Sequence, residues 1–169
     1  MKQSIVSFLF LFILGSTLQA QIKSPSEFLP NYGKQITFYH QTEAYFGHLV
    51  KESSFIKHQV YGQTNEERNL NVYFVSTPEN LANLDQIRNN NLSAIGLSNQ
   101  KNQKIGDKLI VWISFSVHGN EYAGMESAMT VAYELLNPAN KESKEWLKNT
   151  IVILDPCENP DGLSRYANW

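Results

Sequence analysis

The hydrophobic pattern of the chain is dominated by a nearly unbroken apolar run over residues 109–115. An apolar run of this length, bounded by polar residues, predicts a strand that is buried on both faces of a sheet. From Glu121 onward, apolar and small residues recur at helical spacing until Pro138 ends the pattern. Residues 116–120, which read Ser-Val-His-Gly-Asn, therefore connect a buried strand to a helix.

Other strands and helices are predicted on both sides of this junction. Strands are expected over residues 55–61, 70–76 and 150–154, and helices over residues 42–53, 78–89 and 142–148. Thr42 and Thr77 would cap the first two helices, and the asparagines at 89–91 would end the second. Residues 98–107 predict an exposed loop. The order of elements predicts an α/β fold with a starting hairpin and a mixed, mostly parallel sheet flanked by helices.

The first twenty residues have the pattern of a secretory signal peptide. Lys2 supplies a positive start, residues 5–14 form an apolar core, and a cleavage zone ends at Ala20. A membrane anchor is the alternative, but the apolar run is too short to span a bilayer comfortably. The chain is thus expected to be secreted or periplasmic, with residues 21–169 as its folded part and no stable membrane insertion.

Charge and cysteine content exclude some classes of partner and of stabilisation. The formal net charge of −2 provides no basic surface for nucleic acid. Cys157 is the single cysteine, so an exported chain has no internal disulfide. Its place beside an apolar strand predicts a small buried residue rather than a nucleophile.

Two side chains that can bind a metal lie at the strand-to-helix junction. His118 and Glu121 match the pattern H-x-x-E, and Gly119 between them lets the backbone turn without a Cβ. Loops at the carboxyl ends of strands are common ligand sites in open α/β sheets. Because zinc accepts imidazole nitrogen and carboxylate oxygen, the sequence predicts that His118 and Glu121 share a divalent cation. The alternative is a glutamate that caps the helix beside a loop histidine.

A second candidate segment follows the strand predicted over residues 150–154. Residues 159–162, Asn-Pro-Asp-Gly, are strong turn formers, and Arg165 comes shortly after them. This turn should emerge at the same sheet edge as His118. Arg165 could then donate a fork of hydrogen bonds to a carboxylate or a developing oxyanion. A simple surface turn with an exposed arginine explains the same residues equally well.

Together these segments resemble the zinc carboxypeptidases of the M14 type. The resemblance rests on SVHGNE at residues 116–121, on ENPDG at 158–162 with its following arginine, and on residues 61–70. The last segment is similar to the family's Y-G-x-S-x-E-G-R-x-L pattern, with Thr64 in place of serine and Glu67 in place of glycine. The three motifs occur in the family's order, and the resemblance extends over about residues 28–169.

The resemblance implies a zinc-dependent hydrolysis of peptide bonds at the C-terminus of peptides or proteins. His118 and Glu121 would be two of three zinc ligands, and Arg165 would polarise the scissile carbonyl or meet the substrate carboxylate. In the family, the third ligand and the general-base glutamate come after the NPDG segment, and no residue here matches them. We therefore expect a carboxypeptidase-like fold truncated after its fourth strand, inactive and poorly soluble alone because part of the sheet is left uncovered.

Two alternatives stay open at this point. The aspartoacylase and succinylglutamate desuccinylase branch shares the fold and the H-G-N-E motif, and its members are N-acyl amino acid amidohydrolases. A non-catalytic secreted module could instead use exposed tyrosines and tryptophans to bind glycan or peptide without a metal. The NPDG segment and the predicted signal peptide favour the peptidase.

Overall fold

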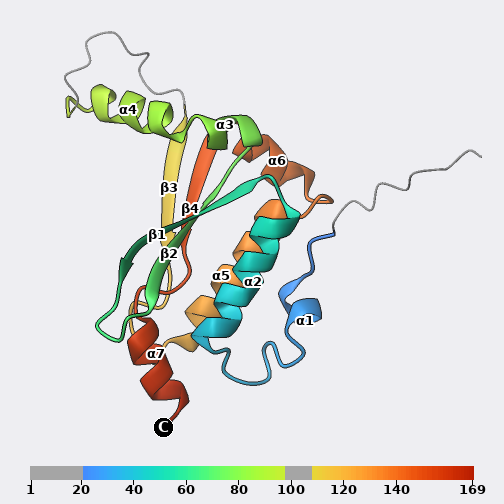
Figure 1. The fold of residues 1–169 in the computed structure, drawn as a ribbon. Coiled ribbons are helices and arrows are strands. Elements are labelled where there is room, and N and C mark those ends of the chain that lie inside the picture. Colours follow the sequence, from blue (N-terminus) through green and yellow to red (C-terminus); the bar gives the residue numbers. More distant parts are fainter. Residues whose placement is uncertain (1–20, 98–107) are drawn as a thin grey trace, which may run out of the picture.

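The structure is a computed structural model that describes residues 21–97 and 108–169 (Figure 1). The predicted signal peptide at residues 1–20 and the loop predicted at 98–107 lie outside the described residues. Within the two described ranges, no helix has both the length and the hydropathy that a membrane crossing requires.

Helices and strands alternate along the chain much as the hydrophobic pattern predicts. The helices are α1 (Pro25–Phe28), α2 (Tyr39–Glu52), α3 (Pro78–Ala82), α4 (Leu84–Ala94), α5 (Tyr122–Leu136), α6 (Lys141–Leu147) and α7 (Pro160–Ala167). The strands are β1 (Ile56–Gln63), β2 (Asn69–Val75), β3 (Leu109–Ser114) and β4 (Thr150–Asp155). The four strands of the described residues form one sheet in the order β1-β2-β4-β3.

The sheet is mixed, and its topology corrects one part of the prediction. The α/β class, the β1–β2 hairpin and the parallel pairing of β3 with β4 are confirmed. The expectation of a mostly parallel sheet is wrong for the described strands, because β2 pairs antiparallel with both β1 and β4. Two successive strands run parallel only if the chain between them crosses back to the end of the sheet where the first strand began. Here α3 and α4 lie across the end of the sheet where β2 finishes, so β3 begins at that same end and runs opposite to β2 (Figure 1).

A hydrophobic core forms between one face of the sheet and the helices α2 and α5 (Figure 1). Both helices present an apolar stripe to the strands, so each helix has one buried side and one exposed side. Solvent does not reach the side chains of Tyr45, Phe46 and Leu49 in α2, Met129 in α5 or Leu154 in β4. The helix predicted from Glu121 onward is therefore one of the helices that flank the sheet, as expected.

The strand predicted to be buried on both faces lies at the edge of the sheet instead. Leu109 and Trp112 of β3 are 62% and 61% exposed, while the central buried strand is β4. The apolar composition of β3 is typical of a strand with both faces covered, but α2 and α5 cover only one face of the sheet. On the other face, a groove under α4 is lined by apolar side chains of the strands and the helix, namely Phe74, Ile110, Trp112, Ile153, Leu84 and Ile87.

Helix boundaries differ from the predictions where side chains form contacts that a local pattern does not show. Thr77 caps α3 as predicted, by accepting a hydrogen bond from the backbone N–H of Asn80. The asparagines at 89–91 do not end the next helix, since Asn91 donates back to the carbonyl of Ile87 and α4 continues to Ala94. Thr42 is not a cap either: α2 starts three residues earlier, and Thr42 is buried within it.

Candidate metal centre

The loops that follow β3 and β4 leave the sheet side by side. The N–H of Phe115 donates to the carbonyl of Asp155 at 2.9 Å, and the N–H of Glu158 donates to the carbonyl of Phe115 at 3.1 Å. These bonds extend the parallel β3–β4 pairing beyond the strand ends. The two candidate segments therefore emerge at one edge of the sheet, as the sequence predicts.

His118 and Glu121 face each other across the connection between β3 and α5. The Nδ1 atom of His118 lies 3.1 Å from the Oε1 atom of Glu121, and the N–H of Glu121 donates to the carbonyl of His118 at 3.0 Å. Glu121 occupies the N-cap position of α5, but its side chain accepts no capping hydrogen bond. Both side chains are exposed, at 70% and 58% of their surface, so a ligand from solvent can reach them.

The spacing of this pair is compatible with a shared zinc ion. Zinc–nitrogen and zinc–oxygen bonds of about 2.1 Å in a tetrahedral site place two donor atoms about 3.4 Å apart. The observed 3.1 Å between the His118 and Glu121 donor atoms needs only a small adjustment to meet this spacing. Within the described ranges, no group of three or more His, Cys, Asp or Glu side chains is arranged to hold a metal. The pair thus fits as two ligands of an incomplete set.

Gly119 is needed for close packing against α7. A Cβ atom on Gly119 would lie 2.1 Å from the carbonyl carbon of Gly162, in the first turn of α7. The backbones of the two segments therefore touch where any other residue would separate them. The sequence predicts that Gly119 allows the backbone to turn. The structure shows that it also allows the two candidate segments to lie in close contact.

The Asn-Pro-Asp-Gly segment begins a helix, which the sequence reasoning described only as a turn. Asn159 caps α7 by accepting a hydrogen bond from the N–H of Gly162 at 2.9 Å, and Pro160 occupies the first helical position. The amide of Asn159 also donates to the carbonyl of Val117 at 3.2 Å. Asn159 thereby joins α7 to the residue directly before His118.

Arg165 lies on α7, and its side chain is paired with Glu66 rather than with His118 or Glu121. Its Nε and Nη2 atoms donate to Oε1 of Glu66 at 3.1 and 2.7 Å, and 73% of its side chain is exposed. The structure therefore brings two of the three predicted site residues together and pairs the third with the β1–β2 turn.

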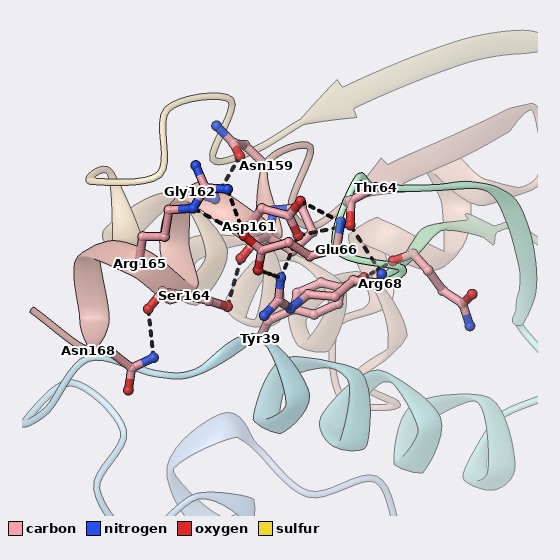
Figure 2. A network of polar contacts seen from close by, with 12 residues as sticks. Tyr39, Thr64, Glu66, Arg68, Asn159, Asp161, Gly162, Ser164, Arg165 and Asn168 are labelled. Atoms are coloured by element: carbon pink, nitrogen blue, oxygen red, sulfur yellow. Dashed lines mark hydrogen bonds and ion pairs between the residues drawn. The ribbon is translucent and has the colours of Figure 1, made fainter.

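A polar network around Asp161 joins the β1–β2 turn to α7 (Figure 2). Oδ1 of Asp161 accepts from Oγ1 of Thr64 at 2.8 Å and from Nη1 of Arg68 at 2.5 Å. Its Oδ2 accepts from the N–H of Glu66 at 3.2 Å. Burial alone would raise the pKa of Asp161, but the hydrogen bonds from Thr64 and Arg68 outweigh it and lower that pKa.

The turn between β1 and β2 takes a shape that suits glycine at one position. Glu67 has a φ of 60°, in the left-handed region that costs most residues about 1–2 kcal/mol. It is the position where the resemblance noted above has glycine. The N–H of Arg68 donates to Oγ1 of Thr64 at 3.1 Å, which closes the turn.

Sequence reasoning missed Asp161 and Asp155 as contact residues. Asp161 lies in the NPDG segment and Asp155 ends β4, and both bond to the 61–70 motif. The hydroxyl of Tyr61 donates to Oδ2 of Asp155 at 2.7 Å, whereas Oδ1 of this buried carboxyl accepts no hydrogen bond from the described residues. Burial raises the pKa of Asp155. The sequence feature that could have indicated the Asp161 contact is the opposite charge of Arg68 and Asp161, which lie in two separate motifs.

Cys157 is buried, as predicted, and burial raises the pKa of its thiol to about 12. The thiol is therefore protonated at neutral pH and is a poor nucleophile. The prediction that Cys157 is a packing residue agrees with this environment.

Comparisons with known proteins place these features in a wider group. Residues 42–169 match the model of the family described as zinc carboxypeptidase. Among solved structures, carboxypeptidase A from Helicoverpa armigera shares 17% identity at a TM-score of 0.57, over 84% of this chain and 33% of that one. Thrombin activatable fibrinolysis inhibitor shares 16% identity at a TM-score of 0.57, over 89% of this chain and 31% of that one.

The structural matches extend over only part of the related proteins. This chain spans about a third of the length of the two solved structures. No curated protein sequence shows a significant match to it.

Proposed function

This chain belongs to the zinc carboxypeptidase family, as the resemblance predicts, and we propose that it is the N-terminal portion of the catalytic domain of an exported zinc metallocarboxypeptidase. The proposed substrates are peptides or proteins, from which the enzyme would remove C-terminal residues. The observation that carries this proposal is the 3.1 Å approach of His118 Nδ1 to Glu121 Oε1 at the carboxyl end of β3. A solvent-facing imidazole and carboxylate at this spacing suit a catalytic metal better than a structural one.

His118 and Glu121 would hold the zinc ion, and the loop between β3 and α5 would keep their donor atoms turned toward each other. When bound, zinc lowers the pKa of a coordinated water and polarises a carbonyl oxygen. Arg165 would bind the substrate carboxylate or its carbonyl oxygen through its guanidinium group. Since that group donates to Glu66, substrate would have to exchange with or share this contact.

Residues beyond those described here would complete the site. Catalytic zinc commonly has three protein ligands and one open position, whereas the present pair supplies two. The uncovered apolar face of β3 and the coverage of about a third of the related structures both support further residues that pack on this part. On its own, residues 21–169 would bind zinc weakly and would not hydrolyse peptides.

Zinc titration of the chain tests the proposed metal pair. We expect weak binding that the His118→Ala substitution weakens by about tenfold or more, because one ligand is lost. His40→Ala is the matched control, since His40 is an exposed histidine on α2 and should leave the dissociation constant unchanged. Zinc binding that is equally strong in the His118→Ala variant would refute the proposed site, whereas zinc binding that depends on His118 would exclude a metal-independent binding module.

A second assay tests the reaction. Release of C-terminal amino acids from peptides should require a longer protein that contains residues 21–169, and should be abolished by His118→Ala in that protein. Hydrolysis of N-acyl amino acids in place of peptides would favour the amidohydrolase branch.

A further inference from the structure

Both ends of the motif at residues 61–70 are hydrogen-bonded to the segment that runs from the end of β4 into α7. Tyr61 at the start of the first motif donates to Asp155, and Thr64 and Arg68 near its end donate to Asp161. Ninety or more residues separate each pair along the chain. Contacts of this kind between a strand turn and a helix start fix the position of α7 relative to the sheet.

The Asp161 contacts are the more sheltered part of this network. The side chain of Asp161 is 13% exposed and that of Arg68 is 31% exposed, whereas Arg165 is 73% exposed. Ion pairs shielded from water retain more of their attraction than fully exposed ones. Both oxygens of Asp161 also accept hydrogen bonds from the β1–β2 turn, so one carboxylate holds the turn in three places.

The first turn of α7 in turn touches the loop that carries the candidate metal ligands. Gly162, the residue after Asp161, lies against the backbone of Gly119, and Asn159 donates to the carbonyl of Val117. His118 therefore has a neighbour fixed to α7 on each side. A shift of α7 would move this loop, because packed backbones cannot slide without steric overlap.

From these contacts we infer that Asp161 is a positioning residue for the metal pair. By tying the β1–β2 turn to the first turn of α7, it holds residues 117–121 in the conformation that brings His118 Nδ1 to Glu121 Oε1. The hydrogen bonds of the Asp161 side chain go to the β1–β2 turn, so it acts on the pair through Gly162 and Asn159. The inference rests on the proposed function, because it assigns a role toward the same zinc site.

Asp161→Asn tests the inference with little change of shape. The amide removes the charge that faces Arg68, and its NH₂ group must face either the Thr64–Arg68 donors or the N–H of Glu66. We expect the zinc dissociation constant to rise about fivefold, in the range of couplings between linked sites. Calorimetric titration with zinc chloride, well below the unfolding temperature of both proteins, measures the change, and amide exchange of residues 117–121 should accelerate.

A matched control separates positioning from a general loss of charge. Glu145→Gln breaks the exposed ion pair between Glu145 of the far helix α6 and Lys148 directly after it, in which Nζ and Oε2 lie 2.7 Å apart. This substitution should leave the zinc affinity unchanged. If Asp161→Asn does not fold, Thr64→Val removes a single hydrogen bond to Asp161 and should raise the dissociation constant about twofold.

The outcomes distinguish this inference from the proposed function. Equal zinc affinity in the folded Asp161→Asn variant and the wild type, or in Thr64→Val where that variant is needed, overturns the inference alone. Zinc binding by the wild type that does not depend on His118 overturns the proposed function and the inference with it.

Discussion

The core under α2 and α5 and the contacts around α7 are held together by different forces. In the core, side chains such as Phe46 and Leu154 are fully buried among other apolar groups. Around α7, hydrogen bonds and ion pairs join residues that are partly exposed, with Arg68 and Asp161 at their centre. Burying one large apolar side chain stabilises a fold by about 1.5–3 kcal/mol, and an exposed ion pair by about 0.2–1 kcal/mol.

This difference separates folding from site geometry. The core determines whether the sheet and its two helices form, while the weaker polar contacts determine where the His118 loop lies. Substitutions that remove a polar contact around α7 should therefore disturb the site at a small cost in stability. Substitutions in the core should do the reverse.

Leu154→Ala should have the largest effect on stability. Leu154 lies in the central strand with no exposed surface, so its truncation leaves a cavity and costs about 3 kcal/mol of unfolding free energy. Urea unfolding monitored by circular dichroism measures the loss. Leu109→Ala is the matched control, because Leu109 lies on the parallel neighbour β3 but is 62% exposed, and it should cost less than about 0.5 kcal/mol. Equal losses in the two variants would contradict the burial difference between these strands.

Gly119→Ala should have the next largest effect, at the point where the metal loop meets α7. Its Cβ would lie 2.1 Å from the backbone of Gly162, so the two segments must separate, at a cost of about 2 kcal/mol. Gly47→Ala is the control, since a Cβ there meets nothing within 4 Å. A Gly119→Ala protein with wild-type stability and wild-type zinc affinity would show that this close approach is not important.

The sequence pattern predicted the elements of the core well, because their signals are local. Apolar runs, β-branched and aromatic residues, and helical apolar spacing located the four strands and most helices of the described residues. What it could not show was which faces would be covered: β3 has the composition of a fully buried strand but lies at the sheet edge. The direction of β2 relative to β4 likewise depends on where α3 and α4 pack, which is a tertiary property.

The candidate site was predictable only in part. His118 and Glu121 lie close together because both belong to one short connection. The partner of Arg165 could not be predicted in the same way, since Glu66 lies 99 residues away along the chain. The helix α7 was missed because Asn-Pro-Asp-Gly forms turns and helix starts equally well.

Asp155→Asn should alter how stability depends on pH. Burial raises the pKa of Asp155 above its ordinary value of 3.8, so the folded chain holds this proton more tightly than the unfolded chain. The stability that this carboxyl contributes therefore falls as pH rises above about 4. Asparagine does not titrate, so the unfolding free energy of the variant should improve relative to wild type between about pH 4 and pH 7. Urea unfolding across this range measures the difference.

Glu66→Gln provides the contrasting control for this pH effect. Hydrogen bonds from Arg68 and Arg165 lower the pKa of Glu66 from its ordinary 4.5. Its contribution to stability is therefore present above pH 4.5 and is lost as pH falls further. The Gln variant should lose stability relative to wild type as pH rises, opposite to Asp155→Asn. If the unfolding free energies of the two variants changed with pH in the same direction, burial of Asp155 and the arginine hydrogen bonds to Glu66 could not be the causes of their pKa shifts.

Trp112→Thr should have the smallest effect on stability but a visible effect on association. Trp112 is 61% exposed on the edge strand β3, beside the apolar groove under α4, so its loss should change the unfolding free energy by less than about 0.5 kcal/mol. Exposed apolar edge strands favour self-association, and threonine keeps strand propensity while it removes the apolar surface. Sedimentation velocity should show less self-association of the variant than of the wild-type chain. Ile113→Thr, on the covered face of the same strand, should instead lower stability, since Ile113 packs against the core. A large loss of stability in Trp112→Thr would mean that this face is covered in the folded chain.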